Sequence, residues 1–453
     1  MSDARLTALQ ILMFLDQHRG TLDQALESMQ DETSRLSQRD RALVHALVFG
    51  VIRWQKRLDW IVAHYSRTPL KKIEPAVMHI LRMGIFQILF MDRIPDSASV
   101  NTSVELGKQS GKPWVARYIN GLLRNVVRKR DHIPFPSPDK DLVQHLAVSY
   151  SYPGWLIQKW LRRFTRQETI SLCEAGNRIP PITIRTNTLR TSREELETAL
   201  TKEVKTLQPT LHSPFGLQLT SLGVSIPEMG AYQKGWFQVQ DEAAQLVSMM
   251  AAPEPGQIVL DACAGLGGKT AHLAQMMKNQ GRLIALDNSM EKLKKLGQEM
   301  HRLGIDIVET MPYDLNDAAA DHLSIQFDHV LLDAPCSGLG VIRRNPDIKW
   351  AESKKNIAGY QKRQVQFLHN LAGLIKPGGR LTFSVCSFEE EETEQVTALF
   401  LKDHPAFHRE DRSGDLPDSI NAAIYSDRCL RTYPHRDDMD GFFAVCFRRK
   451  TDG

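Results

Sequence analysis

Two cysteines in the last third of the 453-residue chain stand at the ends of strand-like runs. Cys336 closely follows the apolar run 330–332, with Asp333 between them, and Cys386 follows the run 381–385. Such runs are typical of buried parallel strands, and the carboxyl ends of parallel strands meet at one edge of a sheet. Two thiols with an acid between them at this edge predict covalent chemistry on an electrophile. By spacing alone, either cysteine is a candidate nucleophile.

A glycine-rich loop follows an earlier strand-like run, and its spacing restricts the ligand. The segment 261–270 reads DACAGLGGKT. A phosphate-binding P-loop requires glycine where Cys263 stands, and a dinucleotide-binding loop requires glycine or alanine where Thr270 stands. S-adenosylmethionine has no phosphate, so it needs close approach to the backbone and an acid on its ribose hydroxyls at the end of the next strand. Asp287 occupies that place, roughly 20 residues on, which favours this cofactor over a plain strand-to-helix turn.

These residues need a sheet to hold them, and the sequence from residue 256 alternates between strand-like and helix-like patterns. Such alternation predicts a doubly wound α/β domain, which we place at residues 251–450. The expected strands are 258–261, 283–287, 330–333 and 381–385, and the expected helices are 270–277 and 361–375.

The upstream half of the chain has a different periodicity of apolar residues. Apolar residues recur at spacings of three and four, and Pro75 and Pro113 stand where helices would begin, so residues 1–133 predict an all-α bundle. Alternate prolines mark an extended linker at 131–139. Residues 141–250 begin helically and continue as short alternating strands, which predicts a small α+β module.

The composition is that of an ordinary globular chain with an uneven charge. Hydrophobic residues make up 42% and charged residues 24%, and no apolar run approaches the roughly 20 residues of a membrane span. Six cysteines without a C-x-x-C pair predict neither a disulfide scaffold nor a metal site, and with no signal peptide they indicate a reducing cytoplasm. Residues 1–150 carry 21 Lys and Arg against 15 Asp and Glu, which favours a polyanionic partner but equally describes a solvated surface. Arg185 and Asn187 are candidates to contact phosphate or base, or to lie on an edge-strand surface.

Several motifs together resemble the RNA 5-methylcytosine methyltransferases. The loop 261–270 is similar to their DACAAPGGKT and departs from it at one Gly-Leu pair. The segments 333–338 (DAPCSG) and 384–387 (SVCS) resemble their two cysteine motifs, with valine in place of the usual threonine. The run 340–350 (GVIRRNPDIKW) is similar to the RsmB (Sun/Fmu) branch, the bacterial 16S rRNA cytosine-C5 methyltransferases. The helical front resembles the NusB-like RNA-binding domain of that branch.

The resemblance implies a role for each site residue. Cys386 would be the nucleophile that adds to C6 of cytosine, Cys336 would act in the release step, and Asp333 would contact the cytosine and the methyl-bearing region. Asp287 would hold the ribose of S-adenosylmethionine and Asp314 would lie by its adenine. The cofactor loop would comprise Cys263, Ala264, Gly265, Leu266, Gly267, Gly268 and Lys269.

The implied chemistry is nucleophilic catalysis. Addition of a thiolate to C6 turns the ring into an enamine, whose C5 is then able to attack a methyl sulfonium. The target base has to leave its stack to meet the thiolate, so base flipping is expected, and Arg343, Arg344 and Lys349 would meet RNA phosphate. We expect a monomeric, cytoplasmic, metal-free enzyme that acts on 16S rRNA. The alternatives are a tRNA cytosine-C5 methyltransferase and a non-catalytic RNA-binding factor.

Overall fold

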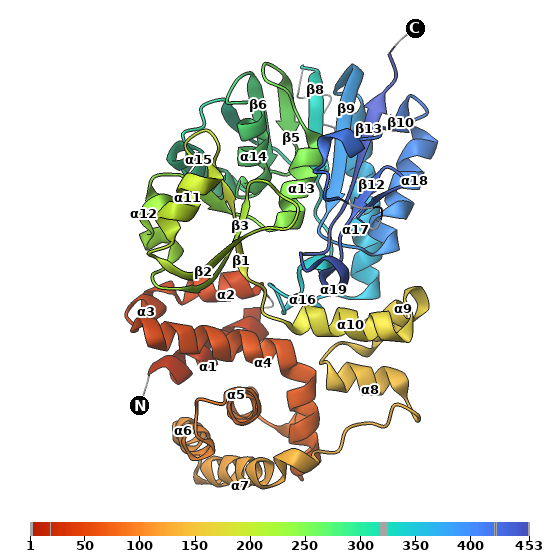
Figure 1. Ribbon diagram of the computed structural model, residues 1–453. Coiled ribbons are helices and arrows are strands. Elements are labelled where there is room, and N and C mark those ends of the chain that lie inside the picture. The colour runs from red at the N-terminus through yellow and green to blue at the C-terminus, as the bar shows by residue number, and fades with distance from the viewer. Residues whose placement is uncertain (1–2, 19, 318–324, 421, 423, 452–453) are drawn as a thin grey trace. The chain divides into compact units, whose positions relative to one another are not determined.

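The chain divides into two compact units (Figure 1). The computed structural model describes residues 3–18, 20–317, 325–420, 422 and 424–451. One unit comprises Met1–Asn177 together with the short segment Asn345–Ala351, and the other comprises Arg178–Arg344 and Glu352–Gly453. Across the described ranges, none of the helices combines the length and the low charge that a membrane crossing needs.

The first unit is helical, and the all-α bundle predicted for its front part is confirmed. Ser37 caps the long helix α4 by accepting a hydrogen bond from Asp40 N at 3.1 Å. Apolar side chains from α1, α4, α5, α6 and α7 form one core, and Arg117, Arg124 and Arg128 lie exposed on the outer face of α7. The helices are α1 (Asp3–His18), α2 (Leu22–Ser28), α3 (Gln30–Ser34), α4 (Gln38–Tyr65), α5 (Pro75–Phe90), α6 (Asp96–Lys108), α7 (Pro113–Lys129), α8 (Leu142–Ser149), α9 (Gly154–Arg163) and α10 (Arg166–Asn177).

A segment from the carboxyl-terminal half of the chain also belongs to the helical unit. It contains helix α16 (Ile348–Ala351). Lys349 is fully buried, and its Nζ donates to the carbonyl oxygens of Arg53 and Ser151 at 3.2 Å each. The same nitrogen lies 3.8 Å from the ring centre of Tyr152, and burial lowers the pKa of Lys349 well below its ordinary value. The prediction that Lys349 meets RNA phosphate is therefore wrong.

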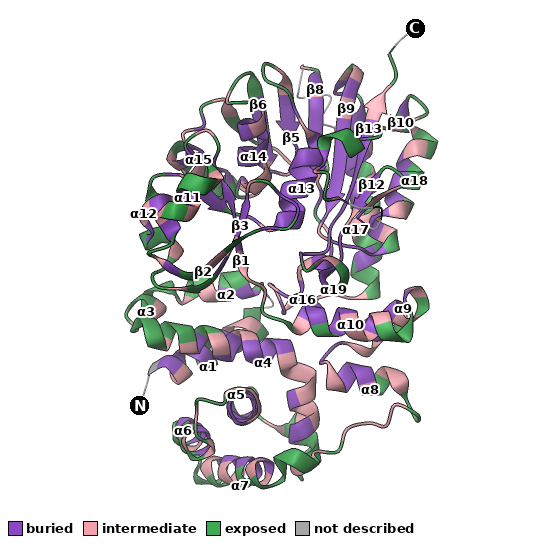
Figure 2. Ribbon diagram, viewed as in Figure 1, coloured by how far each residue is buried: buried purple, intermediate pink, exposed green. Residues whose placement is uncertain are grey.

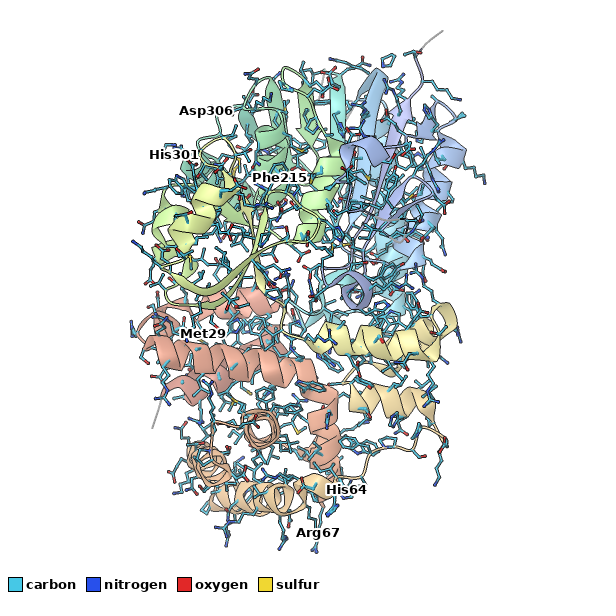
Figure 3. The ribbon with its side chains drawn as sticks, viewed as in Figure 1. Met29, His64, Arg67, Phe215, His301 and Asp306 are labelled. Atoms are coloured by element: carbon cyan, nitrogen blue, oxygen red, sulfur yellow. The ribbon has the colours of Figure 1, made fainter. Side chains whose placement is uncertain are left out.

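The second unit begins with the strand-containing part of the α+β module predicted for residues 141–250, a four-stranded antiparallel sheet in the order β2-β3-β1-β4. The helices at the start of that predicted module, α8, α9 and α10, belong to the first unit. Ile184, Leu217 and Phe237 are buried in the core of this sheet together with residues of α11 (Arg193–Leu200). Phe215, labelled in Figure 3, packs edge-on against the buried ring of His272, with the ring centroids 5.5 Å apart. The strands are β1 (Ile182–Thr186), β2 (Val204–Pro209), β3 (Gly216–Leu222) and β4 (Phe237–Val239), and α12 (Gly230–Gln233) precedes the last of them.

The larger sheet contains the expected strands, and its order is β11-β12-β13-β9-β8-β5-β6-β7, with β10 paired to β13. Strands β9, β8, β5, β6 and β7 run parallel, and β13 lies antiparallel to β9. Side chains of α13, α14 and α15 join one core against the sheet, and those of α17 and α18 join a second, so the doubly wound α/β domain is confirmed. Figure 2 shows strands β5, β8 and β13 mostly buried, whereas the edge strand β7 is mostly exposed. The strands are β5 (Ile258–Asp261), β6 (Arg282–Asp287), β7 (Val308–Pro312), β8 (Phe327–Asp333), β9 (Ile375–Val385), β10 (Phe407–Arg409), β11 (Tyr425–Ser426), β12 (Cys429–Arg431) and β13 (Phe443–Arg449), and the helices are α13 (Glu242–Ala251), α14 (Gly268–Met276), α15 (Met290–Leu303), α17 (Lys354–Ala372), α18 (Glu394–Asp403) and α19 (Pro434–Asp437).

Candidate active site

The carboxyl ends of four neighbouring parallel strands bring the predicted site residues together. Strand β5 ends at Asp261, β6 at Asp287 and β8 at Asp333, and Cys386 directly follows β9. A cavity of about 340 Å³ opens at these ends. It is lined by Ala262, Cys263, Gly265, Asp287, Asn288, Lys292, Tyr313, Asp314, Leu315, Asn316, Asp333, Ala334, Pro335, Cys336, Arg363, Phe367 and Cys386.

The two cysteines that the sequence singled out face each other across the cavity wall. Sγ of Cys336 lies 3.3 Å from Sγ of Cys386, because β8 and β9 are adjacent and in parallel register. The hydrogen bond with Cys386 and burial raise the pKa of Cys336 well above its ordinary value. The two sulfur atoms are therefore close enough to share a proton.

Asp333 forms an ion pair and a hydrogen bond beside this pair of thiols. Lys269 Nζ donates to Asp333 Oδ2 at 2.6 Å, and Ser384 Oγ donates to Oδ1 at 2.7 Å. Burial by itself would lower the pKa of Lys269, but the charge of Asp333 and the hydrogen bond to it outweigh burial and leave that pKa raised. Lys269 also lies over the ring of Phe442, 4.9 Å from its centre. The ion pair thus joins the glycine loop to the end of β8.

The glycine loop adopts a conformation that only glycine takes without strain. Gly265 and Gly267 have φ angles of 56° and 87°, in the left-handed region that L side chains rarely adopt. A Cβ on Gly267 would lie 2.8 Å from Cγ of Leu296. Asp287 Oδ2 accepts a hydrogen bond from Gly265 N at 3.1 Å, so the acid at the end of β6 also fixes the turn.

The predicted cofactor residues do not all reach the cavity. Cys263, Gly265, Asp287 and Asp314 line it. Ala264 is buried and Leu266 is 59% exposed, while Gly267, Gly268 and Lys269 lead into α14. Asp314 Oδ1 accepts hydrogen bonds from Asn316 N at 2.9 Å and from Asn316 Nδ2 at 2.7 Å.

Several residues that line the cavity were not anticipated from the sequence. Asn288 and Lys292 follow Asp287 in the same turn and the helix after it, so their position after the predicted ribose acid was an available signal. Arg363 and Phe367 come from α17, whose sequence reads as an ordinary amphipathic helix, and Tyr313 follows an edge strand. Among the residues that the structure describes, no group of three or more His, Cys, Asp or Glu side chains could hold a metal ion.

Asp261, at the start of the glycine loop, is a buried carboxyl that contacts the loop from outside the cavity. It is 1% exposed, and its Oδ2 accepts a hydrogen bond from Thr270 Oγ1 at 2.7 Å. Burial raises the pKa of Asp261 to about 7. The first acid of the loop motif is thus a buried structural group that titrates near neutrality and does not line the cavity.

The arginines after Cys336 form internal ion pairs. Arg343 Nε donates to Asp440 Oδ1 at 2.6 Å, and the Arg343 side chain is 3% exposed. Arg344 pairs with Asp440 at 2.7 Å and with Asp241 at 2.6 Å. The prediction that Arg343 and Arg344 meet RNA phosphate is therefore wrong, because their charges are already used inside the unit.

Arg185 and Asn187 fit neither of the roles considered for them. Both are buried, at 1% and 3% exposed. Arg185 donates to the carbonyl oxygen of Gly268 at 2.9 Å, and Asn187 Nδ2 donates to the carbonyl oxygens of Gly235 and Leu303 at 2.8 and 2.9 Å. Both side chains thus connect the small module to the ends of α14 and α15.

The doubly wound sheet, the glycine turn and the acids at the strand ends define a methyltransferase domain of the S-adenosylmethionine-dependent class. Comparison with protein families agrees. The family described as 16S rRNA methyltransferase RsmB/F matches residues 248–448, the NusB family matches residues 2–128, and the RsmF/B-like ferredoxin-like domain matches residues 152–225.

Relatives extend the match to the whole chain. The probable ribosomal RNA small subunit methyltransferase B of Bacillus subtilis is 32% identical over 444 residues, which cover 98% of each chain. The protein of the same description from Synechocystis is 32% identical and covers 99% of this chain and all of its own. The chain belongs to the family of the ribosomal RNA small subunit methyltransferases B.

Solved structures share the architecture. The crystal structure of PH0851 superposes with a TM-score of 0.81 at 26% identity and covers 98% of both chains. The structure of NSun6 from Pyrococcus horikoshii with SFG has a TM-score of 0.60 at 23% identity and covers 67% of this chain and all of that one. At that identity the second likeness concerns the fold alone.

Proposed function

We propose that the protein transfers a methyl group from S-adenosylmethionine to C5 of a cytosine in 16S rRNA through a covalent bond between Cys386 Sγ and C6. The observation that carries this proposal is the pair of thiols, 3.3 Å apart beside Asp333 on the cavity wall. A methyltransferase whose substrate is already a good nucleophile does not need a thiol at the site. Cytosine C5 is a poor nucleophile, and covalent activation splits one difficult step into two easier ones.

The residues around the cavity fit the cofactor. No atom lies within 4 Å of the position that a Cβ on Gly265 would take, so the loop leaves room for close approach to its backbone. Asp287 and Asp314 would accept hydrogen bonds from the ribose hydroxyls and the adenine amino group, respectively. When bound there, S-adenosylmethionine supplies an electrophilic methyl group on a sulfonium.

Cys386 and Cys336 have different roles in the proposed reaction. The Cys386 thiolate adds to C6, and the electron pair of the C5–C6 double bond becomes available at C5. After methylation, the thiolate of Cys336, in contact with Cys386, is assigned to accept the proton of C5. The electron pair of the C5–H bond then re-forms the C5–C6 double bond, the C6–S bond breaks, and Cys386 leaves as the thiolate. Asp333 accepts a hydrogen bond from the cytosine amino group.

Trapping the covalent intermediate tests the division of roles. We expect Cys336→Ala to accumulate a denaturation-resistant complex with RNA, because the adduct forms but does not collapse. Cys386→Ala should form none. Denaturing gel electrophoresis after incubation with 16S rRNA and S-adenosylmethionine measures both variants, and the reverse pattern would exchange the two assignments.

Bisulfite mapping identifies the substrate. We expect one cytosine of 16S rRNA to lose its protection from bisulfite in a strain without this gene, and to regain it when the wild-type gene but not the Cys386→Ala gene is restored. Loss of protection in tRNA with rRNA unchanged would favour a tRNA methyltransferase. Unchanged rRNA and tRNA, together with absent cofactor binding by the purified protein, would favour a non-catalytic RNA-binding factor.

The helical residues 1–133 would bind the RNA outside the catalytic cavity. Arg117, Arg124 and Arg128 follow one another along the exposed face of α7. Each arginine that contacts phosphate contributes about one unit to the slope of log affinity against log salt. We therefore expect Arg124→Ala to weaken binding of the full chain to 16S rRNA and to reduce that slope. An unchanged slope after replacement of all three arginines would exclude this face.

A further inference from the structure

One buried carboxylate connects the two loops that carry the cysteines. Glu392 closes the short 3-10 turn Glu390–Glu392 before α18 and is fully buried. Its Oε1 accepts a hydrogen bond from Ser337 N at 2.8 Å. Its Oε2 accepts from Ser337 Oγ at 2.5 Å and from Ser387 Oγ at 2.7 Å. Ser337 follows Cys336 and Ser387 follows Cys386, so a single side chain holds the residue next to each thiol.

A glutamine completes this arrangement. Gln364 Nε2, from α17, donates to the carbonyl oxygen of Pro335 at 3.0 Å and to Glu392 Oε1 at 3.3 Å. Cys336 is thus held on both sides, through the carbonyl of Pro335 and through the N–H and hydroxyl of Ser337. The positions of the two Sγ atoms therefore depend on a network centred on Glu392 and lying behind the cavity wall.

We propose that Glu392 is a positioning residue for the proposed reaction, which holds the turns after β8 and β9 so that Sγ of Cys336 and Sγ of Cys386 stay in contact. This inference rests on the two-thiol mechanism proposed above and assigns Glu392 no contact with substrate.

The chemistry of the network favours positioning over simple core packing. A carboxylate without solvent costs several kcal/mol unless donors compensate it, and an apolar side chain would fill the same space without that cost. Burial raises the pKa of Glu392, and the hydrogen bonds from Ser337 and Ser387 oppose that rise. The negative charge also contributes to the raised pKa of Cys336, so Glu392 helps to keep that thiol protonated.

Two substitutions separate the hydrogen bonds from the charge. In Glu392→Gln the amide oxygen still accepts from Ser337 N, and the amide NH₂ faces two serine hydroxyls that are able to accept. The network survives and only the charge is lost. In Glu392→Ala every bond is lost, and both turns are free to move. Glu390→Gln is a matched control, because Glu390 lies in the same turn but is exposed.

The measurement is single-turnover methylation of 16S rRNA, with cofactor affinity and thermal unfolding recorded for each variant. We expect Glu392→Ala to slow methylation by about a hundredfold, the loss typical of a misplacement of about 1 Å, with S-adenosylmethionine affinity unchanged within twofold. Glu392→Gln should recover most of the rate, and its pH-rate profile should move to lower pH because the charge beside Cys336 is gone. Glu390→Gln should match the wild type.

Methylation by Glu392→Ala at the wild-type rate would overturn the inference. So would a Glu392→Gln enzyme as slow as Glu392→Ala with its fold and cofactor affinity intact, because the hydrogen bonds alone would then not suffice. If Glu392→Ala does not fold, the pair Ser337→Ala and Ser387→Ala removes both hydroxyl donors and should slow methylation at least tenfold; a wild-type rate for that pair also overturns the inference. A wild-type enzyme that methylates no cytosine C5 would instead refute the proposed function.

Discussion

Replacing Asp333 by asparagine isolates the charge that the site places beside the thiols. Lys269 Nζ lies 2.6 Å from Asp333 Oδ2, and the Lys269 side chain is 11% exposed. In Asp333→Asn the amide oxygen is able to accept from Lys269, and the amide NH₂ is able to donate to the hydroxyl of Ser384. The shape and the hydrogen bonds are kept, so the substitution removes the negative charge and little else.

The expected loss of stability follows from the burial of the pair. Removing one partner of a buried ion pair costs about 3–5 kcal/mol, because the other charge stays buried without compensation. The Asp333 side chain is 30% exposed, so water screens part of the attraction and we expect about 2–3 kcal/mol. For a unit of this size that is a fall in Tm of roughly 5–10 °C.

The pKa of Lys269 determines how the difference in Tm between wild type and Asp333→Asn changes with pH. In the wild type the raised pKa of Lys269 contributes stability that is fully present below the unfolded-state pKa of about 10.4 and is lost only as pH rises through the folded pKa. In Asp333→Asn, burial dominates and lowers the pKa of Lys269. The buried ammonium therefore destabilises the variant near neutral pH, and this destabilisation disappears as Lys269 loses its proton at higher pH. The difference in Tm between wild type and Asp333→Asn should therefore be widest near neutral pH and narrow toward pH 10.

Thermal unfolding by circular dichroism between pH 7 and about 10 measures this difference. Glu309→Gln is the control, because Glu309 pairs with Arg282 at 2.7 Å on the surface, where both side chains are more than two-fifths exposed. An exposed pair contributes about 0–1 kcal/mol. An Asp333→Asn protein that loses no more Tm than Glu309→Gln, or a difference that stays constant with pH, would refute the reasoning.

Three further substitutions have defined outcomes. Gly267→Ala should weaken S-adenosylmethionine binding at least tenfold in calorimetry, because φ of Gly267 is 87° and the added Cβ collides with side chains of α15. Gly268→Ala is the control: its added Cβ meets no atom within 4 Å, so the variant should bind S-adenosylmethionine normally. Burial raises the pKa of Asp261 to about 7, so ionisation of this carboxyl destabilises the native state as pH rises from about 4 to 7. Asp261→Asn removes that cost, and we expect the free energy of unfolding of the variant, measured by denaturant unfolding, to rise relative to the wild type between pH 5 and 8. Lys349→Met should lower the Tm of the helical unit by several degrees, because two buried carbonyl oxygens and the side-chain oxygen of Asn177 lose their donor. Lys354→Met on the surface should leave the Tm unchanged.

Local pattern was sufficient for the fold and for the meeting of the thiols. The runs 330–332 and 381–385 are fully buried strands, and strands of this kind with helices between them pair in parallel. Once they are neighbours, Asp333 lies opposite Ser384 and the two cysteines that follow meet. This geometry depends only on period and direction, which a single sequence carries.

The burial of the basic residues after Cys336 could not be predicted from local sequence pattern. An exposed phosphate-binding cluster and an internal ion-pair network have the same local composition. Arg343 and Arg344 became internal because Asp440 and Asp241, about a hundred positions away in either direction, lie beside them. Lys349 was buried beside the carbonyl oxygens of Arg53 and Ser151, which precede it by 296 and 198 positions in the chain. Such long-range partners leave no periodic signal near the residue itself.

The protonation of Cys336 bears on which thiol attacks. A nucleophile has to be a thiolate, and the hydrogen bond with Cys386, burial and the charge of Glu392 all raise the pKa of Cys336. Cys336 therefore holds its proton more tightly than an ordinary thiol, and its sulfur lies 3.3 Å from that of Cys386. A thiol with a raised pKa forms a more basic thiolate, which suits the proton acceptor of the release step, whereas the attacking sulfur needs a thiolate that forms readily. The burial of Cys336 and the charge of Glu392 near it thus support the proposed assignment of Cys386 as the nucleophile.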